Sequence, residues 1–96
     1  MKIPKIMVVC GFGLGTSLVL KMTLDDVLQK NRIDADTFCS DADTAIGQSY
    51  DLVLTSKEMR EIFEEETKPI IFIQNFLSFD EVQTKAIPVI QKMVDE

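Results

Sequence analysis

The sequence predicts an α/β fold, in which a four-stranded parallel sheet carries helices on both faces as a three-layer sandwich. Short apolar runs alternate with helical patterns along the chain, as expected for parallel strands joined by right-handed crossovers. The run 51–55 is apolar on both faces, which is typical of a central strand. We expect the strand order 2-1-3-4, with the switch point beside the first strand. At 96 residues the chain is expected to form a single domain, 1–96.

The first half of the chain is expected to hold two strands and two helices. Residues 5–9 have the character of a buried strand, and a helical pattern continues from the glycine-rich stretch to about Lys30. Thr16 or Ser17 is the expected N-cap of that helix. A short second strand within 35–39 and a brief helix follow. The first helix has an apolar stripe at 3.6-residue spacing: Ser17, Leu20, Leu24, Val27 and Leu28.

The second half continues the alternation with the central strand, a polar helix and a fourth strand. The polar helix is expected from Lys57 to about Glu65. The fourth strand is expected over 69–73, where Pro69 is tolerated as the first residue because no ladder hydrogen bond is lost there.

A closing helix is expected after residue 77. Ser78 and Glu81 have the spacing of a capping box, which marks a helix start. Pro88 falls inside the helical pattern and is expected to kink the helix or split it near Ala86, because proline lacks the N–H of a helix bond.

Composition excludes several classes of function. Sixteen acidic and ten basic residues give a net charge of -6, and without a basic run nucleic-acid binding is not expected. No apolar run reaches the ~20 residues of a membrane-spanning helix, and no signal peptide is recognisable. A cytoplasmic location is therefore expected, where the two cysteines are expected to be free thiols.

The residue types also restrict the chemistry. The chain has no histidine, which removes the commonest general base and the commonest metal ligand. The two cysteines lack the C-x-x-C spacing of a zinc site or a thioredoxin-like redox pair. We therefore expect neither a metal nor a cofactor, and neither Cys-His nor Ser-His-Asp catalysis.

The segment 10–17, Cys-Gly-Phe-Gly-Leu-Gly-Thr-Ser, carries the strongest functional signal. It places a thiol at the end of a buried strand and three glycines before a helix. Glycines allow backbone N–H groups to turn inward as an anion-binding nest, and the first turn of the helix adds free amides. Cys10 is the candidate nucleophile. The predicted phosphate-binding residues are Gly11, Phe12, Gly13, Leu14, Gly15, Thr16 and Ser17.

This segment differs from other known phosphate-binding loops. A Walker A loop needs a lysine before the hydroxyl residue, and a dinucleotide fingerprint needs one more residue between its glycines. Cys10 alone is also typical of a buried strand residue. A low-molecular-weight protein phosphatase has Cys-x5-Arg, but position 16 is threonine here. Without that guanidinium group, hydrolysis is expected to be poor and a phosphocysteine to persist.

This combination resembles the IIB components of the bacterial sugar phosphotransferase system over nearly the whole chain. The loop, followed by Lys21 and Met22, is most similar to the ascorbate-type branch, with the galactitol-type branch as a near relative and the lactose and cellobiose branch as a more distant one. The resemblance implies a flavodoxin-like fold, shared with the low-molecular-weight phosphatases. It also implies a phosphotransferase in which Cys10 takes a phosphoryl group from phosphohistidine on a IIA protein.

The resemblance further implies that the phosphoryl group passes to a sugar, ascorbate in that branch, carried by the membrane IIC component. The protein would then act in the cytoplasm, associated peripherally with the transporter. A phosphate-binding regulatory module of the same fold and a weak phosphatase remain alternatives. Cys39 could lie near Cys10, although a core thiol is the simpler interpretation. Thr55 and Ser56 border the expected site and are equally explained as helix caps.

Overall fold

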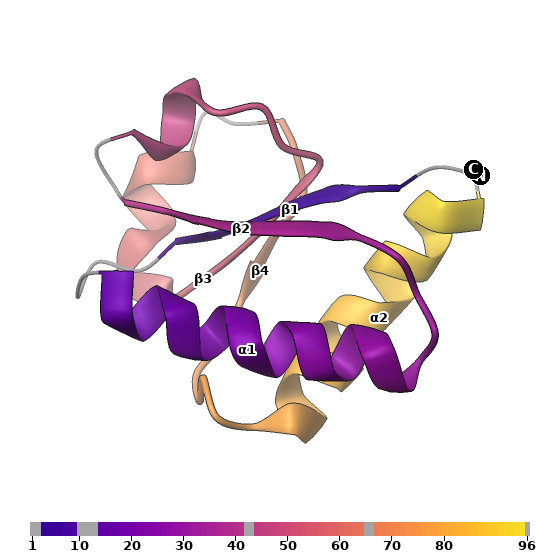
Figure 1. Ribbon diagram of the computed structural model, residues 1–96. Helices are drawn as coiled ribbons and strands as arrows, with labels where there is room; N and C mark the ends of the chain where they lie inside the picture. Colours follow the sequence, from indigo (N-terminus) through magenta and orange to yellow (C-terminus); the bar gives the residue numbers. More distant parts are fainter. Residues whose placement is uncertain (1–2, 10–13, 42–43, 65–66, 96) are drawn as a thin grey trace.

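The computed structural model describes residues 3–9, 14–41, 44–64 and 67–95. Four parallel strands form one sheet in the order β2-β1-β3-β4 (Figure 1), which confirms the predicted fold class and strand order. In chain order the elements are β1 (Lys5–Val9), α1 (Leu14–Lys30), β2 (Asp36–Ser40), the 3-10 helix η1 (Ala45–Gly47), β3 (Leu52–Thr55), the 3-10 helix η2 (Lys57–Phe63), β4 (Ile70–Phe72) and α2 (Phe79–Asp95).

The register of the sheet brings the carboxyl ends of all four strands level with one another. Val9 at the end of β1 pairs with Ser40 of β2 and with Thr55 of β3. Thr55 in turn pairs with Phe72 of β4. Ligands of open parallel sheets bind beyond such ends, at the point where the chain order reverses. Here that point lies between β1 and β3.

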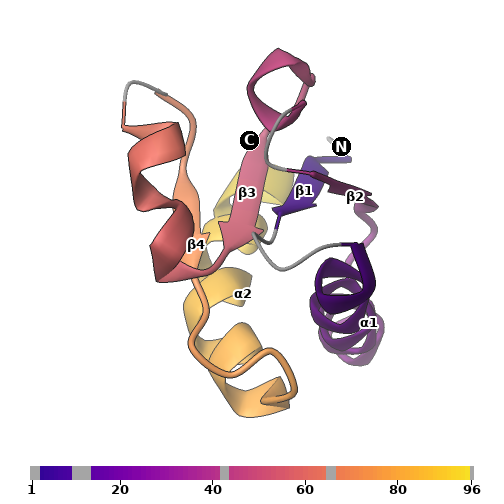
Figure 2. The same ribbon diagram turned by 90° about the vertical axis from the view of Figure 1, so that its left-hand side faces the viewer.

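Two layers of helices cover the sheet, as predicted. Side chains alternate between the faces of a strand, so Ile6 and Val8 of β1 pack with α1 and α2, whereas Met7 and Val9 pack on the side of η1 and η2. Figure 2 shows α1 and α2 together beneath the sheet and η2 on its other side. Among the described residues, no helix has the length and apolar character needed to span a membrane.

The helix α1 begins earlier than the capping prediction required. Leu14 is its first residue, so Thr16 and Ser17 lie within the first turn and are not N-caps. Ser17 is only 1% exposed. It occupies the buried stripe that also holds Leu20 and Leu24 and faces β2 across the helix–sheet contact. Ser17 is therefore a small buried residue of the helix–sheet contact and does not cap the helix.

The polar helix after β3 is a short 3-10 helix, Lys57–Phe63, rather than the longer helix expected. Only Met59 and Phe63 of this segment are buried. Two buried side chains provide little of the tertiary packing that stabilises most protein helices. The segment therefore forms a tight connection between β3 and β4.

The helix α2 begins as predicted but is not split. The Ser78 hydroxyl accepts the N–H of Glu81 at 3.1 Å, which is the N-cap interaction. The helix is continuous across Pro88, so the expected break near Ala86 is wrong. Both Pro88 and Thr84, whose carbonyl loses its helix donor, are exposed. Water can therefore satisfy that carbonyl, while Ala86 and Ile90 hold the inner face in the core.

Candidate functional site

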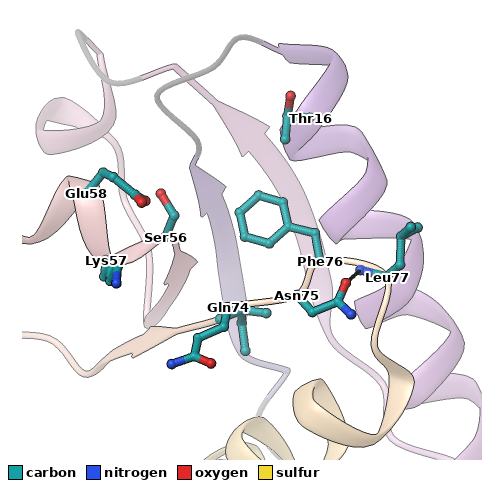
Figure 3. A pocket seen from close by; sticks show the side chains of 9 residues that line it. Thr16, Ser56, Lys57, Glu58, Gln74, Asn75, Phe76 and Leu77 are labelled. Carbon is teal, nitrogen blue, oxygen red and sulfur yellow. Dashed lines mark hydrogen bonds between the residues drawn. The ribbon is translucent and has the colours of Figure 1, made fainter.

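A cleft of about 610 Å³ opens at the carboxyl ends of β3 and β4, beside the first turn of α1 (Figure 3). Three separate segments form its walls, and each reaches it at the end of a strand or the start of a helix. This is the position at which the strand order predicts a ligand. The lining residues are Thr16, Ser56, Lys57, Glu58, Ile73, Gln74, Asn75, Phe76 and Leu77.

The end of β1 is fastened to the end of β3 beside this cleft. The hydroxyl of Thr55, fully buried, donates a hydrogen bond to the carbonyl oxygen of Val9 at 2.7 Å. Cys10 follows Val9 directly in the sequence. Thr55 thus fixes the point from which the segment 10–13 departs, although its side chain does not line the cleft.

The next residue, Ser56, does line the cleft and is 7% exposed. Its Oγ is the one buried side-chain oxygen or nitrogen without a hydrogen-bond partner in the part of the chain that the structure describes. Ser56 holds the N-cap position of η2 but makes no side-chain capping bond. Its proximity to Glu58 nevertheless helps, after the backbone N–H of Glu58 itself, to lower the pKa of that exposed carboxyl.

The opposite wall is the segment 74–77, and the carboxylate of Glu81 fixes its backbone. That carboxylate accepts the N–H of Gln74 at 2.7 Å and the N–H of Asn75 at 2.8 Å. It also pairs with the ammonium group of Lys85, which donates to the carbonyl of Phe72 at 3.0 Å. Burial alone would raise the pKa of Glu81, but these bonds together hold it below its usual range.

Hydrogen bonds join the same wall, 74–77, to α1 and connect residues within the wall. The Thr23 hydroxyl donates to the carbonyl of Phe76 at 2.7 Å, and the N–H of Leu77 bonds to Asn75 Oδ1 at 3.0 Å. Phe76 is half-buried and presents its ring toward the interior of the cleft (Figure 3), whereas Leu77 is 77% exposed. The wall therefore has a fixed backbone and an apolar rim.

The sequence-predicted phosphate segment is only partly covered by the structure. Cys10, Gly11, Phe12 and Gly13 lie outside the described residues. Leu14 begins α1, and Gly15 follows with open space around the position of a Cβ. Thr16 and Ser17 follow in the first turn of α1. Thr16 lines the cleft, whereas Ser17 is buried and its hydroxyl faces the sheet.

Cys39 is a free, half-buried thiol in β2. It pairs with Val8 of β1 and packs against the core beneath α1. Burial raises the pKa of Cys39 above that of an ordinary thiol, against the smaller opposing effects of Lys21 and a hydrogen bond from Ser17, while Asp25 adds to the increase. These are the properties of a structural thiol, not of an activated nucleophile.

Sequence reasoning did not find the role of Glu81 or the segment that it fixes. The Ser-x-x-Glu spacing indicated a capping box, yet the N–H of Ser78 bonds to the carbonyl of Asn75 instead of to Glu81. Nothing in the sequence indicates that the Glu81 carboxylate turns toward the preceding loop, 74–77. Within the described ranges, no group of three or more cysteine, aspartate or glutamate side chains is placed to hold a metal ion.

Comparisons with known proteins agree with this architecture. A family model described as "PTS system, Lactose/Cellobiose specific IIB subunit" matches residues 5–87. The fold is similar to that of the lactose-specific IIB component domain of the phosphoenolpyruvate:carbohydrate phosphotransferase system from Streptococcus pneumoniae, with a TM-score of 0.59 and 18% sequence identity over 98% of this chain and 97% of that one. No curated protein sequence matches the chain. These findings support a IIB component but not the ascorbate-type branch that the loop resembles.

Proposed function

The chain belongs to the family of phosphotransferase-system IIB subunits, and from this premise we propose that Cys10 is its phosphoryl carrier. Members of this family are phosphotransferase components of sugar uptake and work with IIA and IIC components. In the proposed cycle, Cys10 takes a phosphoryl group from phosphohistidine on a IIA protein and passes it to a sugar carried by the membrane IIC protein. The domain 1–96 would act in the cytoplasm, associated peripherally with that transporter.

The observation that carries this proposal is the position of the cleft. It lies at the carboxyl ends of the strands, against the first turn of α1, and one residue beyond the buried Thr55–Val9 hydrogen bond the chain reaches Cys10. A helix N-terminus offers free amides and a positive dipole end to an anion. The remaining residues proposed to bind phosphate, Gly11 to Ser17, connect the cysteine to that helix end.

The chemistry requires only a thiolate and a correctly placed phosphorus. In the first step the sulfur of Cys10 forms a bond to phosphorus while the bond from phosphorus to the imidazole nitrogen breaks, and the electron pair returns to the imidazole. In the second step a sugar hydroxyl oxygen forms the new bond to phosphorus while the sulfur–phosphorus bond breaks, and the hydroxyl proton passes to solvent. The sulfur leaves as thiolate and the carrier is regenerated. Both steps depend mainly on in-line positioning and charge stabilisation.

Two sugar classes have support from different observations. The loop Cys-Gly-Phe-Gly-Leu-Gly-Thr-Ser favours ascorbate, whereas the description of the matching family favours a lactose or cellobiose type of disaccharide. Phosphorylation of labelled ascorbate, cellobiose and lactose by membranes containing the cognate IIC protein distinguishes them. Because the IIB chain is common to all three assays, a difference in product identifies the sugar.

Incubation with a phosphorylated IIA protein, followed by intact-protein and peptide mass spectrometry, tests the carrier role. We expect one added phosphoryl group on Cys10 in the wild type and none in Cys10→Ser, whereas Cys39→Ser should be labelled like the wild type. Absence of label on the wild type would favour a phosphate-binding regulatory module instead. Sustained turnover of p-nitrophenyl phosphate would identify a phosphatase.

A further inference from the structure

Among the described residues that line the cleft, Ser56 has a buried hydroxyl without a hydrogen-bond partner. Ser56 is more than nine-tenths buried, and its Oγ makes no hydrogen bond to a described residue. Leaving such a group unsatisfied is unfavourable, and natural proteins avoid it unless a ligand or a function uses the group. The adjacent Thr55 shows the contrast, because its buried hydroxyl is fully used by the carbonyl of Val9.

Ser56 lies where its hydroxyl could bind an anion held in the cleft. Ser56 and Thr16 line the same cleft from opposite walls (Figure 3), and Thr16 belongs to the first turn of the 17-residue helix α1. An anion in the cleft would meet the free amides of α1 from one side. A hydroxyl from the other wall would supply a second donor to the same group.

We infer that Ser56 Oγ donates a hydrogen bond to a phosphoryl oxygen held in this cleft, with inorganic phosphate as the simplest ligand. The inference rests on the proposed phosphoryl-carrier function and adds to it a catalytic residue outside the glycine-rich loop. A donor fixed by burial holds a phosphoryl group in one orientation for in-line transfer without contributing a positive charge.

Neighbouring charges modify the same site. Glu58 lies next to Ser56 in the cleft wall, and Lys57 partly offsets its charge. Figure 3 shows the Ser56 hydroxyl and the Glu58 carboxylate on the same side of the cleft. A phosphate in the cleft is repelled by the negative charge of the Glu58 carboxylate. Glu58→Gln should therefore bind phosphate more tightly than the wild type.

Two measurements on the full chain test the assignment. The first is the affinity for inorganic phosphate, from the amide chemical shifts of ¹⁵N-labelled protein. The second is the rate of Cys10 phosphorylation by a phosphorylated IIA protein. Ser56→Ala should lower the affinity and the rate about tenfold each, as expected for a hydrogen bond to a charged group, and Ser56→Thr should retain both. Ser49→Ala, at an exposed serine, is the matched control.

Thermal unfolding separates this role from a structural one. Ser56→Ala removes an unsatisfied group, so its midpoint should equal or exceed that of the wild type. A lower midpoint with unchanged phosphate affinity would identify Ser56 as a cap and overturn the inference, as would wild-type affinity and rate in Ser56→Ala. If the wild type is never phosphorylated, the carrier proposal fails, while the phosphate titration still decides the role of Ser56.

Discussion

The carboxylate of Glu81 accepts the backbone N–H of Gln74 at 2.7 Å, so a residue in the first turn of α2 fixes the start of the loop that precedes that helix. The N–H of Asn75 makes a second bond to the same carboxylate at 2.8 Å. One side chain thereby holds the backbone of a cleft wall. The pairing with Lys85 keeps this carboxylate oriented, because Lys85 is itself bonded to the end of β4.

Glu81→Ala is expected to destabilise the protein by about 2 kcal/mol, because hydrogen bonds to charged groups contribute about 1.5–3 kcal/mol and two backbone donors lose their acceptor. Urea unfolding followed by circular dichroism measures the change. Glu61→Ala, at an exposed glutamate of η2, should change stability by less than about 0.5 kcal/mol. Equal stability of the two variants would show that the Glu81 bonds contribute nothing.

The stabilisation from Glu81 should depend on pH. The folded-state pKa of Glu81 is lowered, so the unfolded chain binds its proton first as the pH falls. The contribution is therefore complete above the unfolded pKa of about 4.3 and is lost as the pH falls through the folded pKa. The difference in stability between the wild type and Glu81→Gln should be constant from pH 7 to pH 5.5 and should shrink in acid. A difference that grows in acid would contradict the assigned direction.

Arg32→Gly is expected to stabilise the protein by about 0.5–1 kcal/mol. Arg32 follows α1 with φ 56°, the left-handed conformation that non-glycine residues adopt at a cost of about 1–2 kcal/mol. Glycine removes that cost but loses more backbone entropy on folding. Differential scanning calorimetry should show a higher midpoint for Arg32→Gly than for the wild type. Arg60→Gly, in η2, is the control and should lower the midpoint.

Cys39 is expected to react with iodoacetamide more slowly than a model thiol at pH 7.5. Burial raises its pKa, so less of the reactive thiolate is present at a given pH. The rate should still be rising at a pH where a free thiol has reached its plateau. Peptide mass spectrometry after timed alkylation measures Cys39 separately from Cys10. A rate equal to that of the model thiol would show that β2 and α1 do not shield the sulfur.

The sheet was predictable because its strands are short apolar runs whose order follows from crossover rules. The start of α2 was predictable because the Ser78 cap is a local interaction. The continuity of that helix across Pro88 was not, because it depends on solvent reaching the Thr84 carbonyl and on tertiary burial of Ala86 and Ile90. Interactions within one helical turn can be predicted from the sequence, whereas contacts between a helix face and the rest of the protein or solvent cannot.

The candidate site divides in the same way. The thiol, the glycines and the helix start are contiguous in sequence, so 10–17 could be proposed as a phosphate-binding segment from the sequence alone. The cleft wall 74–77 was missed because the contacts of Glu81 with Gln74 and of Thr23 with Phe76 arise only in the folded chain. Thr55 and Ser56 were noticed, but only the folded structure shows that the Thr55 hydroxyl has a hydrogen-bond partner and that the Ser56 hydroxyl has none among the described residues. The ascorbate-type branch was predicted from about a dozen residues in and after the loop, and the family match does not support it.

The anchors from Glu81 and Thr23 engage the main chain of the cleft wall and leave the side chains of Gln74, Phe76 and Leu77 without an anchoring task. The backbone shape of this rim therefore does not depend on which side chains it carries. Related chains could exchange these three residues to suit different partner proteins while preserving the same contour. Altered pairing between carriers and transporters would then require neither a new loop nor a new fold.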